Sequence, residues 1–333
     1  MPLPGLLCRT RSGIQCLRKP GSSSLQVWFW FWGCAIESAR AAWRDFGKLA
    51  LNPDPETGVQ VAGQADPDAI KPLMWITPGR VLYCGLLGRP SLRRIGGIII
   101  YVAQQQPIRI SIDGGDWQEG DLAVLPPYVP HRIASQTPSI ADLIIEPETL
   151  QQSSLPPFLR ERQGVVQAPE FVARVRSVLA QWHAQREVMA ADDAAFDRML
   201  FGAALPAARL DARIAQVLAD IANDPGGSTS AAQYAANVGL SFSRFVHLFK
   251  EEVGVPLRTL RMWKRARSML DYVTQNANLA DIAQLTGYPD SSHFSHSIRD
   301  VFGLSPKDVF AGSRKLRLHG LPATAAAKHR PKS

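Results

Sequence analysis

The sequence predicts an α+β chain of two domains: an N-terminal antiparallel β barrel or sandwich, linker helices, and a C-terminal all-α domain with two helix-turn-helix units. Three observations lead to this class. Short β-branched runs alternate with turn residues from 80 to 146, and apolar residues recur at helical spacing from residue 169 onward. One helical sequence pattern also occurs twice in the C-terminal region, about 48 residues apart.

The composition fits a two-domain protein with a polyanionic partner. The chain has 333 residues, of which 46% are hydrophobic, so it is long enough for about two domains with cores. A formal charge of +8 favours a polyanionic partner such as nucleic acid, and it also fits a membrane-surface protein. The four cysteines (Cys8, Cys16, Cys34 and Cys84) lack CxxC or metal-ligand spacing. This indicates reduced thiols rather than a disulfide framework or a zinc site.

Residues 1–70 are expected to form a poorly defined N-terminal extension. The aromatic run at 25–36, LQVWFWFWGCAI, is shorter than the roughly 20 apolar residues that a membrane-spanning helix needs. We therefore predict a cytoplasmic protein without a membrane partner. Basic residues before the run leave an export signal as the alternative. A separate hypothesis is that the assigned start is too early and that folded sequence begins nearer Ile70 or Met74.

Residues 71–147 are predicted to form the β domain. The chain reads RVLYCGLL, GGIIIYVA, IRISIDGG, DLAVLPP, HRIAS and IADLIIEP. Gly-Gly, Asp-Gly and Pro-Pro pairs separate these runs, as turns do between short strands. This pattern is typical of an antiparallel sandwich or a small barrel.

Residues 148–206 are predicted to be linker helices. Pro169 stands at a first helical position, and the following segment carries an apolar stripe of Phe171, Val175, Val178, Leu179 and Trp182. A second helix is expected at 192–201. The stripe fits either a dimer seam or the core of its own domain.

Residues 207–312 contain the duplicated unit. A helix at 208–224 precedes it. In each copy a short helix then carries an alanine, Ala235 or Ala283, four residues before a turn glycine, Gly239 or Gly287. Helix-turn-helix geometry requires a small side chain where the helices meet, and glycine permits positive φ at the turn.

The second helix of each copy has a start signal and a buried stripe. Ser241 is the expected N-cap in the first copy, and Asp290 or Ser291 in the second. The stripes recur every four residues: Phe245, Phe249 and Val253, then Phe294, Ile298 and Phe302.

The outward side chains of these helices are polar and lack carboxylates near the helix start. They are Ser243, Arg244, His247 and Lys250 in the first copy, and Ser292, His293, His296 and Arg299 in the second. A single helix of this kind is usually a solvated face. The repetition instead favours two recognition helices in adjacent major grooves of double-stranded DNA, about 34 Å apart.

The segment 207–312 resembles the DNA-binding domain of the AraC family of bacterial transcription regulators. The resemblance rests on the duplicated unit, the linker RMWKRARSML and the signature IAQLTGYPDSSHFSHSIRDVFGLSPKDVF. It implies a transcription regulator that binds DNA through the eight outward residues, with His247 and His296 as the main readers. Relatives commonly have Arg at these two positions. The resemblance also suggests a homodimer and RNA polymerase as a further partner.

The run GDLAVLPPYVPHRIAS looks like the second cupin motif, with Gly120, Pro126 and His131 at the family spacing. Tyr128 replaces the usual Gly and Ser135 the usual Asn. A cupin-type metal enzyme is the alternative function, but it would need an HxH motif upstream, and His131 is the first histidine of the chain. We therefore predict no metal, no cofactor and no enzyme.

A cupin-like domain without metal resembles the effector-binding half of many AraC-type regulators. It implies control by an unidentified small molecule or by dimerisation. His131 is then either a residue of the effector pocket or a structural residue.

A non-specific nucleic-acid-binding protein is a third function class, which the positive charge would suit. Residues 313–333, with SRKLRLHG near the start and KHRPKS at the end, are predicted to be a disordered basic tail. Such a tail adds salt-sensitive affinity without sequence preference.

Overall fold

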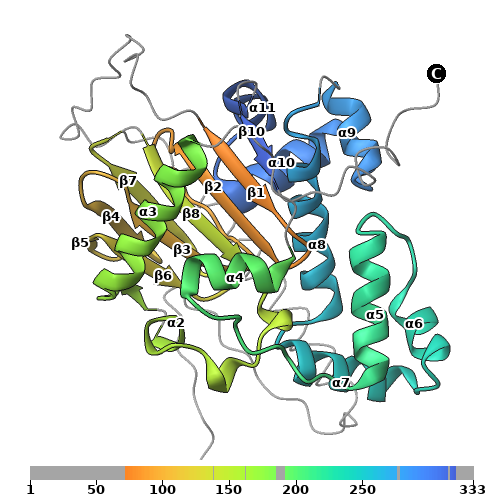
Figure 1. Ribbon diagram of the computed structural model, residues 1–333. Helices are drawn as coiled ribbons and strands as arrows, with labels where there is room; N and C mark the ends of the chain where they lie inside the picture. The colour runs from red at the N-terminus through yellow and green to blue at the C-terminus, as the bar shows by residue number, and fades with distance from the viewer. Residues whose placement is uncertain are drawn as a thin grey trace, which may run out of the picture. The chain divides into compact units, whose positions relative to one another are not determined.

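The computed structural model describes residues 72–137, 139–161, 163–184, 192–275, 278–313 and 316–319. The expectations for residues 1–70 lie outside these ranges. Within them the chain first forms a β-rich region with two sheets and then a set of helices (Figure 1). The predicted fold class is confirmed.

The larger sheet has seven strands in the order β10-β1-β2-β8-β3-β6-β9, and the smaller has three in the order β5-β4-β7. All strand pairs are antiparallel except β1 with β10. The strands of the larger sheet are β1 (Leu73–Ile76), β2 (Arg80–Leu86), β3 (Ile98–Ala103), β6 (Leu122–Leu125), β8 (Ser139–Ile145), β9 (Gly164–Val165) and β10 (Arg317–His319). Those of the smaller sheet are β4 (Ile108–Ile112), β5 (Trp117–Gly120) and β7 (His131–Ser135).

The larger sheet is buried on both faces, because successive side chains of a strand point to opposite sides. Ile99 and Tyr101 of β3 face the interior shared with β4 and β7, whereas Ile98 and Ile100 face the helices that follow the β domain. These helices are α2 (Pro157–Glu161), α3 (Pro169–Ala184) and α4 (Asp193–Phe201), preceded by the short turns η1 (Pro147–Thr149) and η2 (Gln152–Ser154).

The apolar stripe of α3 packs on this second face. Phe171, Val175, Leu179 and Trp182 are buried together with the strands, and the ring of Trp182 stacks on Trp75 of β1 at 4.4 Å. Val178 is partly buried in the same cluster. The stripe is therefore the core of its own domain. The alternative expectation, that the stripe forms a dimer interface, is wrong, because the larger sheet already covers these side chains.

The expectation of a disordered tail from residue 313 is also wrong at its start. Residues Arg317–His319 form β10, which pairs in parallel with β1. The side chain of His319 is 2% exposed, and its ring stacks on Trp75 at 5.7 Å. The outer edge of β1 offers unpaired backbone groups, and the Leu-Arg-Leu-His segment satisfies them. Residues 320–333 lie outside the described ranges.

The C-terminal helices form two units around α8. The first unit contains α5 (Ala212–Asn223), α6 (Ala231–Asn237) and α7 (Phe242–Val253). The connecting helix α8 (Leu257–Ser268) ends in the turn η3 (Met269–Tyr272), and α9 (Leu279–Leu285), α10 (Ser291–Phe302) and α11 (Pro306–Ser313) follow. The first unit has a core of its own, in which Phe245 and Phe249 of α7 meet Ile214 of α5. No described helix combines the length and the apolar character that crossing a membrane requires.

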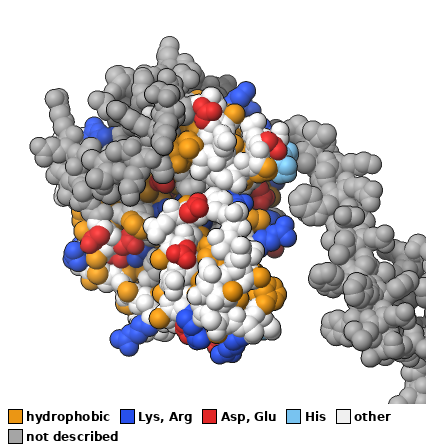
Figure 2. Space-filling model, turned by 90° about the vertical axis from the view of Figure 1, so that its right-hand side faces the viewer, with side chains coloured by type: hydrophobic (Ala, Val, Ile, Leu, Met, Phe, Trp, Pro, Cys, Tyr) orange, Lys and Arg blue, Asp and Glu red, His pale blue; other side chains and the backbone are white. Residues whose placement is uncertain are grey.

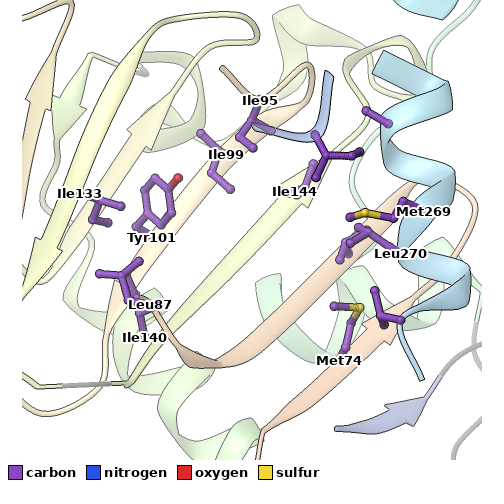
Figure 3. Close-up of a cluster of buried hydrophobic side chains, with 14 of the residues drawn as sticks. Met74, Leu87, Ile95, Ile99, Tyr101, Ile133, Ile140, Ile144, Met269 and Leu270 are labelled. Carbon is purple, nitrogen blue, oxygen red and sulfur yellow. The ribbon is translucent and has the colours of Figure 1, made fainter. Parts of the chain in front are cut away.

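The second unit shares its core with the β domain. Phe294 and Ile298 of α10 belong to one apolar cluster with Met269, Leu270 and the interior between the two sheets of the β domain. Figure 3 shows Met269 and Leu270, at the end of α8, next to Met74 and Ile144 of the sheet. Contacts of this kind make the β domain and the second unit one packed body.

A buried polar cluster at Glu146 accompanies this shared core. Glu146 directly follows β8, and its side chain is 1% exposed. Its Oε2 accepts the indole N–H of Trp263 at 2.8 Å and lies 3.0 Å from Lys264 Nζ. Its Oε1 lies 2.8 Å from Arg267 Nε. Burial alone would raise the pKa of Glu146, but the charges of Lys264 and Arg267 outweigh it and hold that pKa below its usual value.

Glu148 completes the cluster at a distance of 2.5 Å from Lys264 Nζ. Burial and the neighbouring charge of Glu146 raise the pKa of Glu148. The carboxyl groups of Glu146 and Glu148, just after β8, thus face two cations of α8. Charges as well as apolar packing therefore hold α8 against this end of the sheet.

Candidate nucleic-acid interface

The turns of both units have the conformation that their glycines predict. Gly239 has a φ of +66° and Gly287 a φ of +79°, and Ala235 and Ala283 are buried where the helices of each unit meet. A Cβ at Gly287 would collide with the backbone of Gly226. Glycine is thus required there both by its φ and by the close approach of a neighbouring loop.

The helices α7 and α10 begin at side-chain caps. Ser241 Oγ accepts the N–H of Arg244 at 3.3 Å, which confirms Ser241 as the N-cap of α7. In α10 the cap is Asp290, whose Oδ1 accepts the N–H groups of Ser292 and His293 at 2.8 and 2.9 Å. Of the two alternatives for this cap, the structure selects Asp290, and Ser291 is the first helical residue.

The predicted stripes lie inward in both helices. Phe245, Phe249 and Val253 are buried in α7, as are Phe294 and Ile298 in α10. Phe302 is only partly buried, with its ring 6.1 Å from that of Trp263. The opposite faces are therefore the ones available to a partner.

All eight candidate DNA-binding side chains are exposed: Ser243, Arg244, His247, Lys250, Ser292, His293, His296 and Arg299. His293 is also tied to its own helix cap, since its Nδ1 lies 2.8 Å from Asp290 Oδ2. Hydrogen bonds from His293 lower the pKa of Asp290. The contact of these residues with DNA stays a prediction.

Two exposed apolar side chains on α7 were missed by the sequence reasoning, which considered only polar positions. Phe242 is 58% exposed and Val246 is 37% exposed. On the face drawn in Figure 2, Lys and Arg side chains stand in separate groups, with hydrophobic side chains exposed between them. The signal that could have found Phe242 and Val246 is their position in α7, outside the predicted buried stripe.

His131 lies inside the β domain and is engaged by protein atoms at both ring nitrogens. Its side chain is 1% exposed, Nε2 lies 2.8 Å from the Tyr101 hydroxyl, and Nδ1 lies 2.8 Å from the Val129 carbonyl oxygen. Burial lowers the pKa of His131 to about 4, so the ring is neutral, with Nδ1–H donating to Val129 and Nε2 accepting from Tyr101. Among the described residues no group of three or more His, Cys, Asp or Glu could hold a metal ion.

Other polar groups surround this pair in the domain interior. Asp142 stands between Tyr83 and Tyr101 across neighbouring strands, and burial raises its pKa to about 7. Arg93 is 5% exposed, and its Nε–H donates no hydrogen bond within the described part of the chain. Tyr128, which replaces glycine in the cupin-like motif, has a φ of +66°. This is the left-handed conformation, which glycine favours and which a bulky residue such as tyrosine adopts rarely.

Comparison with known proteins matches the helical region to a described domain family. Residues 234–312 match the family "Helix-turn-helix domain". The invasion protein InvF of Salmonella typhimurium is 33% identical over 72 residues, which is 21% of this chain and 33% of InvF. This chain thus spans about a third of the length of that relative.

The solved structures that match this chain are more distant from it in sequence. Apo ToxT K231A from Vibrio cholerae has a TM-score of 0.49 at 11% identity and covers 70% of this chain and 97% of its own. A transcriptional regulator from Chromobacterium violaceum, described by its AraC-type DNA-binding domain, has a TM-score of 0.29 at 20% identity. It covers 31% of this chain and 91% of its own.

Proposed function

We propose that this chain, whose C-terminal helices form a helix-turn-helix domain of the AraC family, is a sequence-specific DNA-binding transcription regulator. The observation that carries the proposal is the repetition of the unit. Both copies have a buried alanine, a turn glycine with positive φ, a capped second helix and an exposed polar face. Two such helices joined through α8 are suited to two successive major grooves of one duplex.

The exposed side chains divide into two kinds of DNA contact. His247 and His296 stand near the middle of their helices, and an imidazole can both donate to and accept from base edges. Arg244, Lys250 and Arg299 carry charge and would bind phosphates, which fixes the position of the protein without reading sequence. A non-specific binder is disfavoured because the polar groups recur at matching helix positions instead of forming an unpatterned basic run.

Control of DNA binding through the β domain is the second part of the proposal. Because the second unit shares its core with the β domain, a ligand or a dimer contact that changes the β domain also changes the support of α10. Arg93 and the partly buried Asp142 are the polar groups that we propose to orient a small molecule in this apolar region, because both ring nitrogens of His131 are already bonded to protein atoms. The effector and the homodimer are parts of this proposal.

We further propose that the chain acts in the cytoplasm, has RNA polymerase among its partners and is not an enzyme. The bonds at His131 support the last point, since both nitrogens of the single cupin-like histidine are already used by Tyr101 and Val129.

Retention of genomic DNA fragments on the full chain tests the proposal. At about 150 mM salt with excess non-specific competitor, we expect a small subset of fragments to stay bound, because non-specific binding is weak under these conditions. Retention of all fragments in proportion to their length would contradict it and favour the non-specific binder.

A further inference from the structure

The first recognition helix has an apolar edge next to its polar face. Phe242 and Val246 are four residues apart in α7, so their side chains lie one above the other on the helix. They are 58% and 37% exposed, and the next residues along the chain are the candidate contacts Ser243 and His247. This edge and the polar face therefore meet a partner together.

The second recognition helix lacks this edge. When the two N-caps, Ser241 and Asp290, are aligned, Ser291 corresponds to Phe242 and Ser295 to Val246. The polar positions agree much better, with Ser243 matched by Ser292, His247 by His296 and Lys250 by Arg299. The two helices thus share their polar positions and differ at the apolar edge.

The surroundings of this edge indicate an anionic partner. Arg244 and Lys250 are exposed on the same helix, and the first carboxylate after the N-cap is Glu251. A partner that fits this surface must therefore carry negative charge. It must also present small apolar groups to Phe242 and Val246, which are one helical turn apart. In the major groove of DNA, the apolar group is the C5-methyl of thymine, and side chains such as Phe are known to contact it.

We propose that Phe242 and Val246 contact thymine methyl groups in the half-site bound by α7, and that α10 reads its half-site without such contacts. The proposal rests on the proposed function. It predicts two unequal half-sites, one of which depends on thymine methyl groups.

Replacement of thymine by deoxyuridine tests this directly, because it removes only the methyl group. A duplex bound by the full chain is obtained by selection from random DNA, and each half is then made with deoxyuridine in turn. We expect the dissociation constant to rise roughly fourfold for each buried methyl group lost in one half, and to stay unchanged when the other half is replaced.

A variant that copies the second helix identifies the residues responsible. Phe242→Ser with Val246→Ser changes two side chains that lie outside the apolar clusters of the described residues, so its thermal unfolding should stay close to that of the parent. We expect it to bind the thymine and deoxyuridine duplexes equally, at the weaker affinity. A variant that still distinguishes the two duplexes, or a parent that does not, overturns this proposal. If no sequence is selected at all, the proposed function fails as well, so the two failures are distinguishable.

Discussion

The indole N–H of Trp263 donates to Oε2 of Glu146 at 2.8 Å, and this bond joins the helix between the two recognition units to the residue that follows β8. Both side chains are 1% exposed, and Lys264 and Arg267 approach the same carboxylate. Since a buried carboxylate is stable only with such partners, Glu146 ties the β domain to α8.

Glu146→Gln is expected to destabilise the protein by about 3 kcal/mol, because it leaves the buried cations Lys264 and Arg267 without their shared counter-charge. Denaturant unfolding of the full chain measures this change. Glu148→Gln should cost less, since Glu148 faces only Lys264 and its own charge is already disfavoured by Glu146.

Asp121→Asn is the matched control for this substitution. Asp121 forms an ion pair with Arg176 at 3.5 Å, but both side chains are solvent-accessible, at 53% and 35%. Its loss should change stability by no more than about 0.5 kcal/mol. Equal effects of the substitutions at Glu146 and Asp121 would mean that the Glu146 cluster does not hold α8.

Asp142→Asn should change the pH dependence of stability. The folded-state pKa of Asp142 is raised to about 7 from 3.8, so the folded state keeps a proton that the unfolded state has already lost at pH 5. The free energy of unfolding of the parent therefore decreases as pH rises toward 8. Asn does not titrate, so the variant does not lose this stability. We expect its stability relative to the parent to increase by about 2 kcal/mol from pH 5 to pH 8.

Chemical unfolding at a series of pH values checks this expectation. His131 has the opposite effect, because its lowered pKa decreases the stability of the protein as pH falls from 6.5 toward 4. Both proteins contain His131, so its effect cancels in the difference between them. A stability difference between variant and parent that does not change with pH would show that Asp142 is ionised in the folded state.

The local features of the helical domain could be predicted from the sequence, and the contacts between its parts could not. The caps Ser241 and Asp290 and the glycines at 239 and 287 act within a few residues, so their signals are visible in short segments. Trp263 and Glu146 are 117 residues apart, and no short segment shows that they meet.

The same limit applies to three further features of the chain. The α3 stripe had two readings because periodicity shows that a face is buried but does not show what covers it. The segment Arg317–His319 looked like a charged tail, and only the open edge of β1 makes it a strand. The partner of His131, Tyr101, lies 30 residues away on a strand of the other sheet.

Two truncations distinguish the strand from the tail. A chain that ends at residue 319 keeps β10 and should unfold at the same temperature as the parent, with weaker DNA binding that depends less on salt. A chain that ends at residue 313 loses the buried Leu316 and His319 and should be less stable by about 2 kcal/mol. Identical unfolding of the two truncated chains would contradict the pairing of β10 with β1.

His247→Ala and His296→Ala are each expected to weaken specific DNA binding by about 1 to 3 kcal/mol if the imidazoles read bases. Gln216→Ala is a suitable control, because Gln216 is exposed on α5, outside both recognition helices. Binding of both histidine variants at the affinity of the parent would remove His247 and His296 from the interface.

Selection of random duplex DNA on the full chain tests the central claim most directly. The full chain is needed because the second unit shares its core with the β domain. We predict a bipartite motif whose halves are about 10 base pairs apart. His247→Ala should lose the preference for one half, and His296→Ala the preference for the other. A single undivided motif affected equally by both variants, or the absence of any enriched sequence, would contradict recognition by two helices in adjacent grooves.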